Sequence, residues 1–233
     1  MVNPVIENQG WSFEPAPGVV ADPVMDASYL HELYARADPH YTSKVTVPLL
    51  WDLERQTIVS NESADIMRMF NSAFDGITGN GRDYYPAAWA KRIDALNARI
   101  YHSLNNGVYR AGFAASQQAY DEAVFDVFSM LDELEETLCS SRFLLGETIC
   151  ETDWRCFTTL VRFDSVYHGL FKCNLRRLAD YPRLWRYARE LYQQEGIAQT
   201  VNFDHIKRHY WCSHRGLNPS GIVPVGPELG WSL

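Results

Sequence analysis

The sequence predicts an α+β protein in which a small mixed domain precedes a larger all-helical domain. Two short strand-like runs both lie before residue 61, whereas apolar residues recur every three or four positions from residue 87 onward. Between them, residues 75–86 are polar and rich in glycine, which is typical of an interdomain linker. A chain of 233 residues is long enough to hold both domains.

Residues 1–74 make up the first predicted domain. Val45, Val47, Leu49 and Trp51 lie at every second position, as in a strand with one buried face. A polar turn and a second short run follow, so two strands are expected to form a hairpin. The expected order is a helix over residues 28–37, strands over 45–51 and 57–60, and a helix over 62–74.

Residues 87–215 make up the second predicted domain, which is all-α. Apolar residues from Ile93 to Leu104 lie three and four positions apart, and a longer run of the same spacing extends from Tyr120 to Leu138. These two amphipathic helices are expected to pack as neighbours. The remaining expected elements are helices near residues 152–163, 183–194 and 202–210, and an extended tail over residues 216–233.

The balance of charge argues against a nucleic-acid partner. The chain carries 21 basic and 29 acidic side chains, a net charge of −8, whereas nucleic-acid-binding domains usually carry a basic excess. No apolar run approaches the roughly 18 residues needed to cross a bilayer, so no membrane partner is expected. The first ten residues lack the basic and apolar regions of a signal peptide, and we therefore expect a cytoplasmic protein.

The five cysteines favour reduced thiols. They lie at positions 139, 150, 156, 173 and 212, an odd number without a C-x-x-C pair. Because free cysteine is among the most buried residue types, buried structural thiols are their expected state.

Two residue pairs around the hairpin have the chemistry of a small-peptide site. A strand that ends at Val47-Pro48 offers backbone hydrogen bonds, and a helix that begins near Glu62-Ser63 offers free amides and a positive end to a carboxylate. Ser63 would hydrogen-bond that carboxylate and Glu62 would pair with an ammonium, a combination that matches a γ-glutamyl head group. From spacing alone, the alternative is an edge-strand proline and a helix capped by Asn61 or Ser63.

These pairs resemble the glutathione-binding half of a thioredoxin-fold glutathione transferase, in which that proline is cis. Longer segments, which run nearly end to end, resemble the glutathionyl-hydroquinone reductases, the Xi class of these transferases. The segments are Asn3-Pro4, Gly10-Trp11-Ser12-Phe13, Ala37-Asp38-Pro39-His40-Tyr41, Asn61-Glu62-Ser63-Ala64, Asn105-Asn106-Gly107-Val108-Tyr109, Thr159-Leu160-Val161-Arg162-Phe163-Asp164, Phe171-Lys172-Cys173 and Asn218-Pro219-Ser220-Gly221. The resemblance implies a partial thioredoxin-like domain followed by the all-α domain of a glutathione transferase.

The family's reaction is reductive and depends on a cysteine thiolate. The thiolate attacks the sulfur of a glutathionyl-hydroquinone, hydroquinone leaves, and a second glutathione clears the mixed disulfide from the enzyme. In the family the nucleophile lies in a Cys-Pro-Trp-Ala motif at the start of the first helix, and this sequence contains no such motif. Because the match begins in the family's second strand, at Val2-Asn3-Pro4, the resemblance implies that the first strand and first helix are absent here.

The resemblance also implies the residues of the site. Trp11 packs against glutathione, Glu62 and Ser63 hold its γ-glutamyl end, and strand-like contacts come from the stretch Lys44, Val45, Thr46, Val47 and Pro48. Tyr109 matches the proton donor and acceptor at the hydroquinone oxygen, and Tyr167 and Tyr210 match tyrosines that help to lower the pKa of the nucleophile. Without the resemblance, amphipathic packing is the ordinary role of such tyrosines. Glutathione as co-substrate, glutathionylated hydroquinones as substrates and a homodimer follow from the same resemblance.

Two other clusters support less specific hypotheses. Four potential zinc ligands lie within ten residues, but no second cluster completes the pattern and two basic neighbours oppose a cation, so no metal is expected. A basic patch could steer anionic glutathione conjugates, although a solvated helix surface is its more common role. The potential ligands are His205, His209, Cys212 and His214, and the patch consists of Lys172, Arg176, Arg177 and Arg183.

Three functional hypotheses stay open. The first is an enzyme of the glutathionyl-hydroquinone reductase type, from a shortened gene product or a start codon assigned too late. The second is a binding protein that clasps glutathione or a glutathionylated aromatic compound without cleaving it. The third is a poorly folded remnant, because removal of a strand and a helix exposes a sheet edge and an apolar face.

The segment Cys150-Glu151-Thr152-Asp153 generates a prediction about stability. Transferases of this fold usually place Ser or Thr at the cap of this helix, three residues before an Asp. Here Cys150, a poor hydrogen-bond acceptor, takes the cap position. We therefore expect Cys150→Thr to stabilise the protein by about 1 kcal/mol and to raise the melting temperature in a thermal unfolding experiment. An unchanged melting temperature would count against this assignment of the cap.

Overall fold

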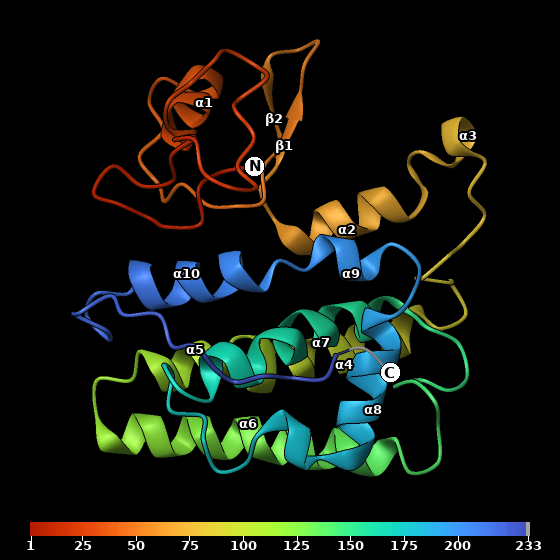
Figure 1. The fold of residues 1–233 in the computed structure, drawn as a ribbon. Helices are drawn as coiled ribbons and strands as arrows, with labels where there is room; N and C mark the ends of the chain where they lie inside the picture. Colours follow the sequence, from red (N-terminus) through yellow and green to blue (C-terminus); the bar gives the residue numbers. More distant parts are fainter. Residues whose placement is uncertain (232–233) are drawn as a thin grey trace.

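A computed structural model describes residues 1–231 and confirms the α+β class (Figure 1). Its two-stranded sheet is antiparallel, with Trp51 opposite Ile58. Apolar side chains of the sheet and of the N-terminal segment pack around buried Leu30, Leu33 and Tyr34. The elements of this part are α1 (Leu30–Ala37), β1 (Leu50–Asp52), β2 (Thr57–Ser60) and α2 (Ser63–Ser72).

The first predicted strand was too long. Residues 45–49 belong to no strand of the structure, and β1 begins only at Leu50. The alternating pattern has another cause, because Val45, Leu49 and Trp51 all pack against the small core around α1. Pro48 follows a cis peptide bond and has no N–H to donate to a ladder, so the segment before it is not held as a strand.

The all-helical part contains each of the predicted helices. Arg99 and Glu133 form an ion pair between the helices predicted over Ile93–Leu104 and Tyr120–Leu138. This contact confirms that the two helices are neighbours. The bounds are α3 (Asp75–Thr78), α4 (Ala90–Ile100), α5 (Gly107–Gly112), α6 (Gln117–Thr137), α7 (Glu151–Arg162), α8 (Pro182–Tyr192), α9 (Ile197–Thr200) and α10 (Phe203–Ser213). The short helix α3 lies in the predicted linker, and the domain boundaries stay predictions.

Two π-helical turns interrupt the predicted helices. Tyr101–Asn105 follows α4 and Phe163–Tyr167 follows α7. Side chains in or next to these turns hold them in place: Asn105 donates to Thr159 Oγ1 at 2.7 Å, and buried Asp164 accepts from the N–H of Ala179 at 3.1 Å. Single π turns occur often at functional sites, and the second one here positions Tyr167.

Helix α10 lies between the small domain and the other long helices (Figure 1). Three of its side chains bind the N-terminal segment. Ser213 Oγ accepts from the N–H of Ile6 at 2.9 Å, and His209 Nδ1 donates to the carbonyl of Pro4 at 2.9 Å. His205 Nε2 donates to the carbonyl of Pro17 at 2.6 Å. This helix therefore joins the two parts of the chain.

The start of α7 and the tail follow the sequence analysis. Cys150 is the N-cap of α7, and its N–H donates to Asp153 Oδ2 at 2.8 Å. Residues 216–231 contain no helix or strand. The tail is anchored by Trp231, which is 6% exposed and packs edge-on against Trp185 with ring centroids 4.8 Å apart. The final two predicted tail residues lie outside the described residues.

The cysteines follow the expectation of buried thiols only in part. All five are free, and Cys150, Cys156 and Cys173 are buried. Cys139 is exposed just after α6 and Cys212 is half-buried in α10, so burial was wrongly expected for these two. Separately, none of the helices formed by residues 1–231 combines the length and the apolar character that crossing a bilayer requires.

The contact of His209 with the N-terminal segment generates a pH prediction. Burial lowers the pKa of His209 to about 4. Because the unfolded chain then binds more protons between pH 6.5 and 4, stability is lost as the pH falls through this window. The loss from this group is roughly 3 kcal/mol at 1.4 kcal/mol per pKa unit.

The measurement is urea unfolding of the wild-type chain and of His209→Asn at pH 7, 5.5 and 4.5. Asparagine keeps a donor for the Pro4 carbonyl but takes up no proton, so we expect a smaller acid loss in the variant. Equal losses in the two proteins would show that His209 does not titrate on unfolding.

Candidate functional site

Three tyrosine hydroxyls from separate elements meet between the helices. Tyr210 of α10 hydrogen-bonds both to Tyr109 of α5 and, at 2.9 Å, to Tyr167 of the second π turn. These three residues, implied by the family resemblance alone, come together in the structure. Two hydrogen bonds use two of the three hydroxyl hydrogens, so the cluster keeps one for the oxygen of a bound ligand.

The three tyrosines differ in access to solvent. Tyr167 is 2% exposed and Tyr210 is 5% exposed, whereas Tyr109 is half-buried. Burial raises the pKa of Tyr109 and of Tyr167 above that of free tyrosine, so both phenols stay protonated at neutral pH. Tyr109 is therefore the member of the cluster with the most access to solvent, and its protonated hydroxyl is able to donate a hydrogen bond.

Phe171 supports the cluster from behind. Its ring stacks on Tyr167 with centroids 5.4 Å apart and lies at the same centroid distance from Tyr109. The ring is fully buried and presses against Gly112 of α5, where an added Cβ would come within 2.4 Å of it. A glycine at this position lets Phe171 pack close to α5 and fixes the orientation of Tyr109.

The predicted glutathione-binding backbone is open. The Val47-Pro48 peptide bond is cis, and within residues 1–231 the backbone groups of Val45 and Val47 have no hydrogen-bond partner. Two phenols hold the carbonyls of the residues just before them: Tyr34 donates to Thr46 and Tyr41 donates to Lys44, both at 2.8 Å. The segment is thus held on one side and free on the other to pair with an extended peptide.

Glu62 and Ser63 lie exposed at the start of α2. Glu62 is the N-cap residue and Ser63 is the first helical residue, and no protein group in the described chain hydrogen-bonds either side chain. Asn61 instead donates to Tyr34 and Thr46. The alternative of a helix capped by Asn61 or Ser63 is therefore wrong, and the free amides of α2 are available to an anion.

Trp11 links the backbone segment with the tyrosines. It packs against the same small core as Val45 and stacks on His209, with ring centroids 5.0 Å apart. His209 in turn contacts the ring of Tyr210 at 4.8 Å. Sequence reasoning missed His209 as part of this site, because only the packing of α10 against the N-terminal segment shows it.

The potential zinc ligands and the basic patch have other partners in the structure. His205 and His209 bind backbone carbonyls, and the thiol of Cys212 donates to the carbonyl of Gly221 at 3.6 Å. Among the described residues, no group of three His, Cys, Asp or Glu side chains is arranged to hold a metal. In the basic patch the arginines pair with Asp132, Asp180 and Glu135, which removes most of its steering charge.

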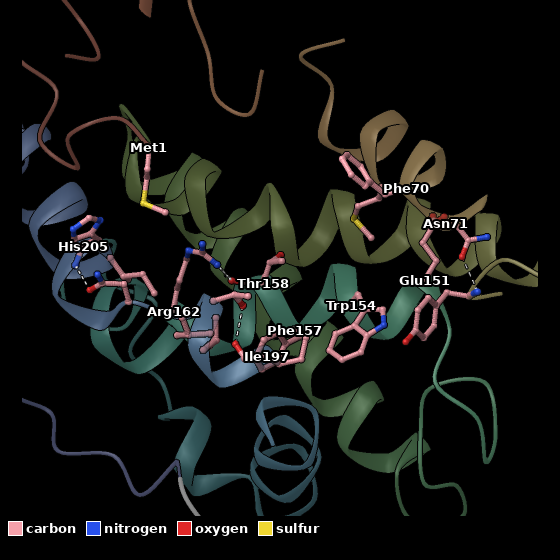
Figure 2. Close-up of a pocket in the computed structure, with 17 residues that line it drawn as sticks. Met1, Phe70, Asn71, Glu151, Trp154, Phe157, Thr158, Arg162, Ile197 and His205 are labelled. Carbon is pink, nitrogen blue, oxygen red and sulfur yellow. Dashed lines mark hydrogen bonds between the residues drawn. The ribbon is translucent and has the colours of Figure 1, made fainter. Parts of the chain in front are cut away.

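A separate pocket of about 620 Å³ lies between α2, α7, α9 and α10. Figure 2 shows Glu151 and Asn71 at one end of it, His205 at the other, and Trp154 and Phe157 between them. None of the predicted glutathione or tyrosine residues lines this pocket.

Comparison with known proteins assigns the class. Residues 117–190 match the family model described as the C-terminal domain of glutathione S-transferase. The glutathione-bound structure of YqjG, a glutathione transferase homologue from Escherichia coli K-12, superposes with a TM-score of 0.97 at 51% identity, covering 99% of this chain and 76% of that one. The Xi-class glutathione transferase of Natrialba magadii gives the same TM-score at 47% identity, covering 100% of this chain and 71% of that one. Fold and site thus define a glutathione transferase.

The sequence comparison narrows the class to a family. The glutathionyl-hydroquinone reductase YqjG of Escherichia coli K12 is 52% identical over 228 residues, which are 97% of this chain and 70% of that protein. The chain belongs to the glutathionyl-hydroquinone reductases, the Xi-class glutathione transferases, a family of enzymes. The resemblance drawn from the sequence is confirmed.

The packing of Phe171 on Gly112 generates a prediction. We expect Gly112→Ala to push the Phe171 ring away from α5 and to lower the free energy of unfolding by about 1–3 kcal/mol, as overpacking does in cores. Urea unfolding measures this change. Gly81→Ala, where nothing lies within 4 Å of an added Cβ, is the matched control. A Gly112→Ala protein as stable as Gly81→Ala would contradict the packing role.

Proposed function

We propose that this chain binds glutathione and glutathionylated hydroquinones and takes part in the glutathione-dependent release of hydroquinone from its conjugate. The backbone of residues 44–48 pairs with the extended peptide, and Trp11 packs against it. Glu62 and Ser63 hold the ammonium and carboxylate of the γ-glutamyl end at the start of α2. The relatives support glutathione as the ligand, because two solved homologues contain it.

One observation carries this proposal: the stack from Trp11 through His209 to Tyr210. This stack connects Trp11 with Tyr210, and it supports a site in which a glutathione bound at residues 44–48 directs its sulfur substituent to the tyrosines. A conjugate needs both surfaces, since its peptide and its aromatic ring have different chemistry. Glutathione alone would need only the peptide-binding surface.

The tyrosine cluster serves the hydroquinone oxygen. In the proposed reaction a thiolate attacks the conjugate's sulfur, an S–S bond forms, the C–S bond breaks, and the aromatic carbon takes up a proton. A second glutathione then reduces the mixed disulfide, giving glutathione disulfide. Tyr109 donates a hydrogen bond to the hydroquinone oxygen. Tyr210 and Tyr167 hold the hydroxyl of Tyr109 in place. A neutral phenol does this without bringing full charge into the site.

The state of the thiols favours a second candidate function, binding without turnover. Burial raises the pKa of Cys150 and of Cys173 to about 12, so these groups are thiols at neutral pH, and exposed Cys139 also has a raised pKa. The Cys-Pro-Trp-Ala motif of the family does not occur among the 233 residues. A chain without the reactive thiolate would clasp the conjugate and leave it intact.

We also propose a cytoplasmic location, where the supply of glutathione is large, and a homodimer as the state in solution. Both follow from the family rather than from the geometry of one chain. No metal is needed for the reaction as written.

The experiment that tests the proposal is calorimetric titration with glutathione. We expect the wild-type chain to bind and Ser63→Ala to bind about tenfold more weakly, because the variant loses a charge-assisted hydrogen bond worth about 1.5–3 kcal/mol. Ser72→Ala, at the far end of the same helix, is the matched control and should bind like the wild type. Absence of binding, or equal affinity in Ser63→Ala, would contradict the proposed site.

A reduction assay on the same sample separates the two candidate functions. The substrate is glutathionyl-menadiol with excess glutathione, and the products measured are menadiol and glutathione disulfide. Turnover supports the reductase, whereas binding of the conjugate without turnover supports the second candidate.

A further inference from the structure

Helix α2 carries the proposed γ-glutamyl site but contributes no fully buried side chain to either domain. Hydrophobic burial is the usual anchor of an amphipathic helix, and here Phe70 of α2 is 55% exposed. The placement of Glu62 and Ser63 relative to the tyrosine cluster therefore needs another anchor. The polar contacts of α2 supply it.

Arg68 is that anchor. Its Nε donates to Glu151 Oε2 at 3.0 Å and its Nη2 to Glu151 Oε1 at 3.3 Å, a two-pronged pair across the domain boundary. The same guanidinium binds Asp94 and lies 4.0 Å from the centre of the Tyr85 ring. A rigid guanidinium fork held by two carboxylates and a ring has little freedom to move.

The receiving carboxylate is itself fixed. Glu151 is 3% exposed at the start of α7. Asn97 of α4 donates to Glu151 Oε1 at 2.8 Å, and Arg155 lies 3.5 Å from the same oxygen. The backbone N–H of Glu151 donates to the carbonyl of Tyr84 at 2.7 Å. A buried carboxylate with this many partners is a fixed point on the helical domain.

Arg68 also joins the two domains by ion pairs. Among the ion pairs of the described residues, those that connect residues 1–74 to the helical domain are all made by Arg68. The other polar ties lie mainly along α10, near Pro4 and Pro17. Arg68 is five residues from Ser63, about 7.5 Å along the helix axis, so a shift at Arg68 tilts the start of α2.

We infer that Arg68, held by Glu151 and Asp94, is a positioning residue for glutathione binding, which it supports by fixing the start of α2 against the helical domain. This inference rests on the proposed function. Arg68 touches no glutathione in this arrangement. It sets the spacing between the γ-glutamyl site and the tyrosines, which lie on different domains.

The test is a double-mutant cycle on glutathione affinity. Arg68→Met, Glu151→Gln and the double variant are titrated calorimetrically at 25 °C, and their melting temperatures are measured in parallel. We expect Kd to rise at least fivefold in each single variant and no further in the double variant, because both substitutions break the same contact. Arg68→Lys keeps the charge without the fork and should fall between wild type and Arg68→Met.

Arg99→Met is the matched control. It removes an exposed Arg–Glu pair that lies wholly within the helical domain, between α4 and α6. This variant should change the melting temperature but leave Kd for glutathione unchanged. A change in melting temperature without a change in Kd separates a positioning role from general loss of stability. If Arg68→Met folds poorly, Glu151→Gln and Arg68→Lys still provide the test.

These measurements distinguish failure of the inference about Arg68 from failure of the proposed function. If the wild-type chain binds glutathione and Arg68→Met binds it equally well while melting earlier, Arg68 is merely structural and this inference is overturned. If the wild-type chain does not bind glutathione, the proposed function fails and the inference fails with it.

Discussion

The site depends on the double-sided packing of α10. His209 faces the small domain, where it binds the carbonyl of Pro4 and stacks on Trp11. The next residue, Tyr210, faces the helical domain and joins the hydroxyls of Tyr109 and Tyr167. Because consecutive residues of one helix contact both domains, the position of Trp11 relative to the tyrosines is set by α10 rather than by a flexible linker.

Much of the fold could be predicted from the sequence, because it rests on local periodicity. Helices α6, α7, α8 and α10 were expected within a few residues of their ends, since amphipathic spacing and caps are local properties. The alternation before Pro48 predicts a strand that the structure lacks, because alternation shows which side chains are buried and not whether a neighbouring strand exists.

The candidate site is non-local, and here the sequence alone has little power. Tyr109 and Tyr210 are 101 residues apart, and Arg68 and Glu151 are 83 residues apart, so no spacing pattern connects them. A π turn adds to the difficulty, because one extra residue rotates the following side chains by roughly 100° around the axis. Tyr167 was therefore assigned through family resemblance, whereas His209 and Arg68, to which the resemblance assigned no role, were missed.

The two halves of the site are stabilised in different ways, and this division suits their chemistry. The tyrosine cluster is packed against fully buried Phe171, and burial raises the pKa of Tyr109 and of Tyr167, which keeps these two phenols neutral. The γ-glutamyl half has to receive a charged and hydrated group, so Glu62 and Ser63 remain exposed and their helix is held by ion pairs instead of by a core. An ion-pair anchor lets α2 keep its amides open to an anion, because a buried start of the helix would exclude the ligand. Rigidity on the aromatic side thus comes from a buried aromatic core, and access on the peptide side comes from the ion pairs that hold α2.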